Sequence, residues 1–258
     1  MGIGVILSLF MAAAVAASPP APGRVVALIA GEGKSQCLPD RSLCLEVPAA
    51  EEGAAADAVL RVLSPGAQAV SLALPEFPEA QSVDLWPKLI RAKGGDGANR
   101  YLVGILTGQT SMYSGGGGSA SQLHLIELDA TPNAARLGGE AIEVPWNGSL
   151  LIRACFSEED MKDRLEACHD EYEFGATLAA APGGAALFPT LSYRAVATAF
   201  PRSSRRSEDN SATKLKRADL VRARDPACTY DRVLRYDAAA ARYQMDRPAP
   251  DCSDYTTP

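Results

Sequence analysis

The segment from Cys155 to Glu173 carries the residue types that bind metal ions. It holds eight acidic side chains against two basic ones, Lys162 and Arg164. Carboxylates beside a histidine are ligands for a hard cation such as calcium. The candidate ligands in this segment are Glu166, His169, Asp170 and Glu171. Their spacing does not follow an EF-hand loop, and no glycine stands where a tight calcium turn needs one. We therefore expect no metal site and no cofactor, and calcium is the metal to test first.

Helix formation offers a simpler reason for these acids. Ser157-Glu158-Glu159-Asp160 has the pattern of a capping box, in which Ser157 caps the helix and Asp160 occupies its third position. Acidic residues in a first helical turn are stabilised by the helix dipole. Met161, Leu165 and Cys168 then fall on one helical face. The pattern predicts one short helix with a solvated acidic face.

No set of residues fits a nucleophilic hydrolase, so we assign no catalytic residue. The chain has two histidines, and His124 lies between leucines in an expected strand, which is typical of a structural side chain. Ser211-Ala212-Thr213-Lys214 matches the serine–lysine pattern of penicillin-recognising enzymes, but their other two motifs are missing. Gly31-Glu32-Gly33-Lys34-Ser35 lacks the first glycine of a phosphate-binding loop and predicts a turn.

Basic residues gather near the C-terminus. Residues 190–258 carry 13 basic and 9 acidic side chains, whereas residues 1–189 carry 12 and 22. The best candidate contact surface is Arg205, Arg206, Lys214, Lys216 and Arg217. No aromatic residues alternate with these bases, so we expect no nucleic-acid partner. The bases could face an anionic component of a cell envelope, but we favour pairing with acids of the same chain, and we interpret 202–216 as an exposed mobile loop.

Six cysteines form three pairs that are local in sequence. We expect the disulfides Cys37–Cys44, Cys155–Cys168 and Cys228–Cys252, because closing a short loop costs the least chain entropy. Zinc binding by these cysteines would need paired C-x-x-C spacings or interleaved histidines, and neither occurs. Disulfides of this kind are typical of proteins in an oxidising compartment.

The N-terminus has the features of a secretory signal. Residues 3–17 are almost entirely apolar or small and end in Val15-Ala16-Ala17, a pattern that signal peptidase cleaves. We expect a signal peptide over 1–17, a proline-rich tether over 18–23, and no transmembrane segment in the mature chain. Arginine outnumbers lysine 19 to 6, which suggests a GC-rich bacterial genome and hence a periplasmic or extracellular protein.

The rest of the chain reads as short apolar segments separated by Gly, Pro and Asp. The clearest expected strands are 101–107 and 122–128, with a flexible glycine loop at 115–118 between them and a hairpin turn at Asn147-Gly148. Further strands are expected from 24–30 through 232–236. We predict an all-β, mainly antiparallel fold, a sandwich or propeller-like arrangement of short strands with one short helix, stapled by disulfides. Residues 24–258 form a single β-rich domain, with a subdivision near 150 as an alternative.

These features favour an exported β-domain that binds or scaffolds something in the bacterial cell envelope without catalysing a reaction. Its partner would be an anionic envelope component or another envelope protein. Two alternatives stay open. One is an envelope hydrolase or carbohydrate-active enzyme with carboxylates from distant strands, since such a pair leaves no motif. The other is a structural domain stabilised by calcium.

Overall fold

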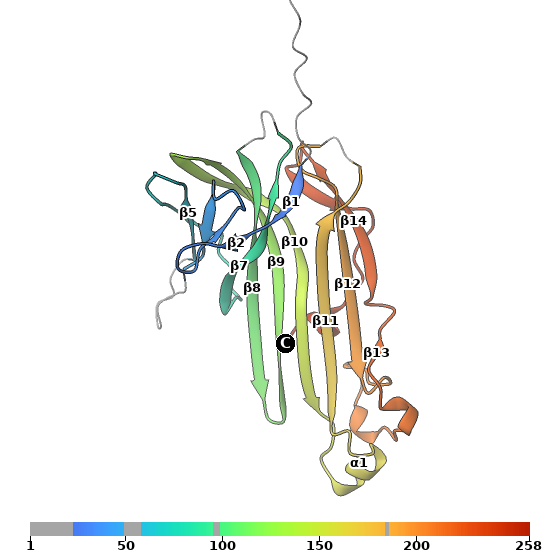
Figure 1. Cartoon of the computed structure of the whole chain (residues 1–258). Helices are drawn as coiled ribbons and strands as arrows, with labels where there is room; N and C mark the ends of the chain where they lie inside the picture. Colours follow the sequence, from blue (N-terminus) through green and yellow to red (C-terminus); the bar gives the residue numbers. More distant parts are fainter. Residues whose placement is uncertain (1–22, 49–57, 95–98, 184–185) are drawn as a thin grey trace, which may run out of the picture.

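A computed structural model describes residues 23–48, 58–94, 99–183 and 186–258 (Figure 1). The expected signal peptide lies outside the described residues, as does all of the tether except Gly23. Ten of the strands form one large antiparallel sheet, which begins at β1 and ends at β15. Its strands, in spatial order, are β1 (Arg24–Ala27), β7 (Ser82–Arg91), β8 (Arg100–Tyr113), β9 (Gly116–Thr131), β10 (Ala134–Arg153), β11 (His169–Ala180), β12 (Leu191–Phe200), β14 (Tyr230–Asp237) and β15 (Arg242–Met245), with β13 (Ala223–Arg224) paired beside β14 on β12.

A smaller sheet of five short strands precedes most of the large one in sequence. It contains β2 (Ile29–Ala30), β3 (Gln36–Cys37), β4 (Cys44–Glu46), β5 (Val59–Leu63) and β6 (Val70–Ala73) in that order. Buried leucines of this sheet, such as Leu45 and Leu60, pack against Val103 and Ile126 on β8 and β9. The small sheet therefore covers one face of the large sheet over β8 and β9.

The main core lies between two parts of the large sheet. The β9–β10 pairing is irregular between Pro145 and Asn147. β10 pairs with β11 only after this irregularity, over residues 147–153. Before the irregularity, β10 pairs with β9 alone. The part of the sheet from β1 to β10 and the part from β11 to β15 therefore separate there and pack against each other. Trp86 and Leu125 from the first part share a core with Leu234 and Tyr243 from the second. A strand that bends at a bulge allows one sheet to form both layers of a sandwich.

The prediction of a mainly antiparallel, disulfide-stapled β fold is confirmed. The three long central strands, however, replace several shorter ones that the turn residues suggested. Gly116, Gly117 and Gly118 belong to β9, and the turn is at Ser114–Gly115. Asn147-Gly148 lies inside β10 rather than in a hairpin turn, because the residues on both sides pair with β9 and β11. Both turn predictions were therefore wrong.

β7 was not expected as a strand, because Pro87 interrupts it. A proline has no N–H to donate to a neighbouring strand and is confined to edges and bulges. The pairing with β8 is shifted between Leu85 and Leu89, so Pro87 lies in the irregular part. The Pro87 carbonyl accepts a hydrogen bond from Leu28 N at 3.0 Å, and the strand continues past the proline.

All three expected disulfides are present: Cys37–Cys44, Cys155–Cys168 and Cys228–Cys252. The predicted capping box is confirmed at α1 (Glu158–Asp163), where Ser157 Oγ accepts from Asp160 N at 3.1 Å. The hydrogen bond that Phe156 N donates to the Asp160 carboxylate lowers the pKa of that carboxylate. The helix ends earlier than expected, since Leu165 has a φ of 51° and lies beyond its end.

The segment from Arg202 to Lys216 is not a wholly exposed loop, as the polar sequence had suggested. Ser204, Asn210 and Leu215 are buried in it, and residues 210–212 form a 3₁₀ turn. A second short helix, α2 (Ser253–Thr256), packs on β10 and β11 near the C-terminus. Within the described residues, no helix has the length and apolar character needed to cross a membrane.

Candidate functional site

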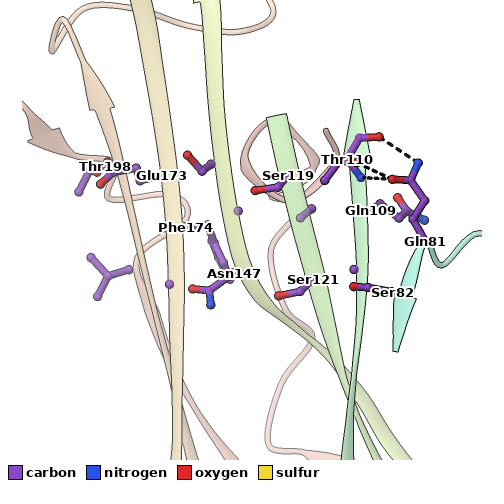
Figure 2. Close-up of a pocket in the computed structure, with 16 residues that line it drawn as sticks. Gln81, Ser82, Gln109, Thr110, Ser119, Ser121, Asn147, Glu173, Phe174 and Thr198 are labelled. Atoms are coloured by element: carbon purple, nitrogen blue, oxygen red, sulfur yellow. Dashed lines mark hydrogen bonds between the residues drawn. The ribbon is translucent and has the colours of Figure 1, made fainter. Parts of the chain in front are cut away.

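An open trough of about 980 Å³ extends across six strands, β7 to β12 (Figure 2). Its lining is composed mainly of small polar side chains and glycines. Among the lining residues are Ser82, Thr110, Ser119, Ser121, Asn147, Ser149, Glu173 and Thr198. We refer to this surface as the polar trough.

The pairing of the strands explains why these side chains share one face. One row of directly paired residues runs from β7 to β12 through Ser82, Gly108, Ser121, Asn147, Gly175 and Val196. A second row, two residues further along each strand, contains Thr110, Ser119, Ser149, Glu173 and Thr198. Paired residues project to the same side of a sheet, and so do residues two apart in one strand. The trough is therefore a regular polar face of the sheet.

The opposite face of the same strands is covered. Gly148 on β10 approaches the backbone of α2 so closely that a Cβ there would overlap the Tyr255 carbonyl oxygen. Phe174 and Ala197, which lie in the same row, are buried in the main core. The face of the sheet that contacts α2 is thus apolar, and the opposite face, which forms the trough, is polar.

The trough carries little charge. Glu173 is its one acidic side chain, and the guanidinium of Arg222 lies 3.3 Å from the Glu173 carboxylate. At the β8 end, Thr110 N donates to Gln81 Oε1 at 2.9 Å, and Gln81 Nε2 donates to Thr110 O at 3.0 Å (Figure 2). The remaining lining offers hydroxyl, amide and backbone groups, which both donate and accept hydrogen bonds.

The four metal candidates near α1 are not brought together as ligands. The buried carboxylate of Asp170 accepts hydrogen bonds from Arg164 and from Ser204 Oγ. Glu171 pairs with Arg222 on the neighbouring part of the sheet. Glu166 and His169 are exposed. These contacts use the acids in ion pairs rather than in a shared ligand set.

Three residues of the basic contact surface make intramolecular contacts through their side chains. Arg206 Nη1 donates to the carbonyl of Thr257 at 2.6 Å, near the end of α2. Lys214 Nζ lies 3.1 Å from the Asp163 carboxylate. Arg205 Nη1 donates to the carbonyl of Ser204 at 2.7 Å. Arg205, Lys216 and Arg217 are exposed.

Large exposed apolar side chains gather at the end of the sheet that carries α1. Met161 and Leu165, together with Leu220 and Arg217, line a surface hollow of about 700 Å³ there. Phe156, just before α1, is 66% exposed. The predicted apolar face of the helix is therefore directed towards solvent, because the helix projects beyond the end of the strands (Figure 1).

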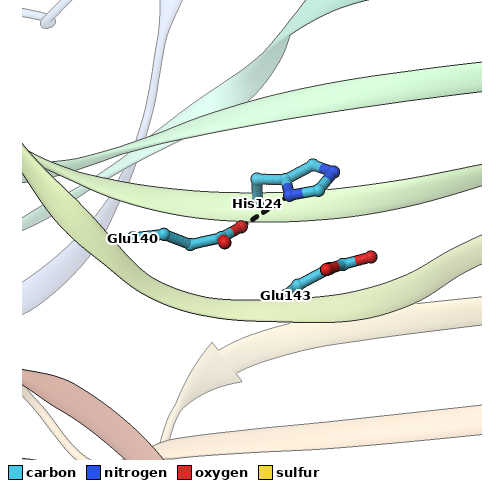
Figure 3. Close-up of side chains that lie close together, drawn as sticks. All are labelled: His124, Glu140 and Glu143. Carbon is cyan, nitrogen blue, oxygen red and sulfur yellow. Dashed lines mark hydrogen bonds and ion pairs between the residues drawn. The ribbon is translucent and has the colours of Figure 1, made fainter. Parts of the chain in front are cut away.

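A third feature is a cluster of three side chains on β9 and β10, His124, Glu140 and Glu143 (Figure 3). One nitrogen or oxygen from each lies within 4.8 Å of the others. The His124 Nδ1 is 2.6 Å from Glu140 Oε1, and its Nε2 is 3.0 Å from Thr107 Oγ1. Among the described residues, this is the one group of three or more His, Cys, Asp or Glu side chains with ligand atoms this close.

Sequence reasoning missed both the trough and the His124 cluster. The signal for the trough was present, since Ser119 and Ser121, like Asn147 and Ser149, are small polar residues two apart in adjacent strands. It was obscured because Asn147-Gly148 was interpreted as a turn. His124 and its carboxylates lie on different strands, and only the strand register brings them together.

Comparison of the chain with protein-family models, with curated proteins and with solved structures finds no match in any of the three.

Proposed function

We propose that the chain is an exported binding protein of the bacterial cell envelope that catalyses no reaction. The polar trough takes an extended, uncharged, hydroxyl-rich polymer such as a glycan strand. The observation that carries this proposal is the pair of rows on the uncovered face of the sheet, one crossing six strands and the other five.

The length of the trough suits a polymer rather than a small molecule. Six neighbouring strands span about 24 Å, given a spacing of about 4.8 Å between strands. A compact ligand would contact few of the six strands. An extended chain could follow one row across all of them, from Ser82 to Val196. Each hydrogen bond contributes only about 0.5–1.5 kcal/mol net, so useful affinity needs many of them along one ligand.

The charge of the trough favours a neutral ligand over an anionic one. Its single carboxylate, Glu173, is beside Arg222, and the lining residues include no Lys or Arg. Sugar hydroxyls donate and accept hydrogen bonds in the same way as the serine hydroxyls that face them. The exposed bases Arg205, Lys216 and Arg217 are not among the residues that line the trough.

The same lining supports a binding role rather than glycoside hydrolysis. Glycosidases generally place two carboxyl groups about 5–10 Å apart across the scissile bond. The trough residues include Glu173 alone, and its carboxylate is already paired with Arg222.

Export is supported by the cysteines. All six form disulfides, and none is free. Disulfides persist in oxidising compartments such as the bacterial periplasm and the extracellular space. The expected signal peptide supports export, and the arginine-rich composition supports a bacterial origin.

The test is binding to an array of neutral and anionic glycans. Ser121→Trp would fill the middle of the trough, and Ser71→Trp on the exposed part of β6 is the matched control. Circular dichroism and thermal unfolding would confirm that both variants fold.

We expect the wild type and Ser71→Trp to bind a neutral glycan, and Ser121→Trp to lose at least about tenfold in affinity, or 1.4 kcal/mol. Retention of binding by Ser121→Trp, a preference for anionic glycans, or cleavage of a bound glycan would each contradict the proposal.

A further inference from the structure

We propose that His124, Glu140 and Glu143 form a zinc-binding site on the face of the β9–β10 ribbon that is opposite the main core. The site is independent of the polar trough, since none of its residues lines the trough. The proposal rests on the geometry of the three side chains and on the irregular strand pairing that aligns them.

Two carboxylates three residues apart in a regular strand point to opposite faces of a sheet. The β9–β10 pairing is irregular between Glu140 and Ile142, where Glu140 pairs with Ile126 and Ile142 pairs with Leu125. Ala141 is thus the additional residue, and both Ala141 and Ile142 pack in the main core. The bulge lets Glu140 and Glu143 project to the same side, and Glu143 is the residue directly opposite His124. Bulges often serve to redirect a functional side chain in this way.

The imidazole is held rigidly in this position. His124 is 6% exposed, and its ring lies against Phe77 with ring centres 4.7 Å apart. Figure 3 shows the ring on one strand and both glutamate side chains on the neighbouring strand, with the Glu140 carboxylate beside Nδ1. A buried, oriented nitrogen beside two more accessible carboxylates needs little rearrangement to bind an ion.

Thr107 allows the histidine to change from its hydrogen-bonded form to its metal-bound form. Nδ1–H donates to the Glu140 carboxylate, which can only accept, and Nε2 lies 3.0 Å from the Thr107 hydroxyl, which can either donate to it or accept from it. When Nδ1 binds a metal, the proton resides on Nε2 and is donated to the same hydroxyl, which can also accept. Metal-binding histidines usually have such a partner on the second nitrogen.

The ligand set selects zinc over calcium or magnesium. One imidazole nitrogen and two carboxylates, with water in the fourth position, match the three-ligand sites that zinc occupies. Calcium and magnesium prefer oxygen ligands alone. Zinc at about 2.0–2.2 Å from each ligand would place the ligand atoms about 3.3 Å apart. The 2.6 Å contact between His124 and Glu140 must therefore open slightly, while the wider contacts, up to 4.8 Å, must close.

The consequence of binding would be a clamp across β9 and β10. Zinc would join the two strands where two irregularities interrupt their pairing. It would stabilise the folded state by mass action, since His124 is 16 residues from Glu140 in sequence and an unfolded chain does not hold it beside the two glutamates.

The experiment uses the full exported chain after treatment with EDTA and dialysis. Isothermal titration with ZnCl₂ gives affinity and stoichiometry, with CaCl₂ and MgCl₂ as comparisons. Glu143→Gln removes one exposed ligand, and Glu166→Gln near α1 is the matched control for charge. Thr107→Val tests the supporting hydroxyl. Because the chain has two histidines, NMR of histidine-labelled protein reports directly on which imidazole binds.

We expect one zinc per chain, a higher melting temperature with zinc, and a shifted signal from His124 but not His169. Glu143→Gln should weaken binding by at least about tenfold and Thr107→Val by about tenfold, whereas Glu166→Gln should bind as the wild type does. The proposal fails if zinc binds no more tightly than calcium, if the His169 signal shifts in place of the His124 signal, or if Glu143→Gln binds zinc normally.

Discussion

Substituting Arg164 with Met is expected to destabilise the protein strongly, although Arg164 lies at the end of a short surface helix. Its side chain is 0% exposed and pairs with Asp170, which is 2% exposed. Arg164 Nε also donates to the carbonyl of Ala167 at 3.0 Å, and Nη1 donates to the carbonyl of Asn210. One guanidinium thus joins the end of α1, the start of β11 and the segment before β13.

The magnitude follows from what Arg164→Met leaves behind. Asp170 would stay buried with Ser204 Oγ, at 2.7 Å, as its remaining side-chain donor. Removing one partner of a buried ion pair costs about 3–5 kcal/mol, since the other charge is left without compensation. That is a large part of the 5–15 kcal/mol that a folded domain of ordinary stability has in total.

The assay is denaturation by guanidinium chloride with the disulfides intact, followed by tryptophan fluorescence. Arg222→Met is the control, because Arg222 also pairs with acids of β11 but is 34% exposed. Its loss should cost about 0–1 kcal/mol. The double variant Arg164→Met/Asp170→Leu should recover most of the stability, since both charges are then gone.

An equal and small loss in Arg164→Met and Arg222→Met would refute this reasoning. It would mean that water or movement of the segment from Arg202 to Lys216 compensates the Asp170 charge. If the double variant does not recover its stability, the lost free energy comes from the hydrogen bonds that Arg164 donates to the carbonyls of Ala167 and Asn210.

Three further predictions concern the C-terminal part of the sheet. Gly148→Val should cost about 1–3 kcal/mol in the free energy of unfolding, because the side chain would overlap the backbone of α2; an unchanged denaturation midpoint would contradict it. Loss of the Cys228–Cys252 disulfide, which joins residues 24 apart, should cost about 3.5 kcal/mol from loop entropy; calorimetry of the double alanine variant measures it, and a change below 1 kcal/mol would oppose it. Burial raises the pKa of Tyr193 above the value of about 10 in an unfolded chain. The stability that its neutral form contributes is therefore complete below pH 10 and is lost as the pH rises above 10. Near-ultraviolet absorbance should show this tyrosine ionising only as the protein unfolds.

The sequence predicts the local features of this molecule better than its long-range ones. The capping box at Ser157 and the three disulfides depend on residues near one another, and all are confirmed. The two wrong turns, at Gly115–Gly118 and Asn147-Gly148, have residues that favour turns. Pairing with strands on both sides outweighs that local preference over Asn147-Gly148, and a glycine in a strand often marks a close approach of another backbone. For Gly148, that approach is the C-terminal helix.

The candidate metal site shows why strand register limits what a sequence can reveal. The β9–β10 hairpin pairs Thr131 with Ala134, and an uninterrupted continuation would set Ala141 opposite His124. Two irregularities, one on each side of Glu140, move the pairing by two residues and bring Glu143 there instead. Neither shift is marked by a motif, although Gly138-Gly139 lies within the first. A histidine flanked by leucines therefore looks structural in the sequence, and becomes a metal ligand only if both bulges form. This predicts that deleting Gly139 would leave zinc binding intact, because the deletion removes the additional residue of the first irregularity and keeps Glu140 opposite Ile126 and Glu143 opposite His124.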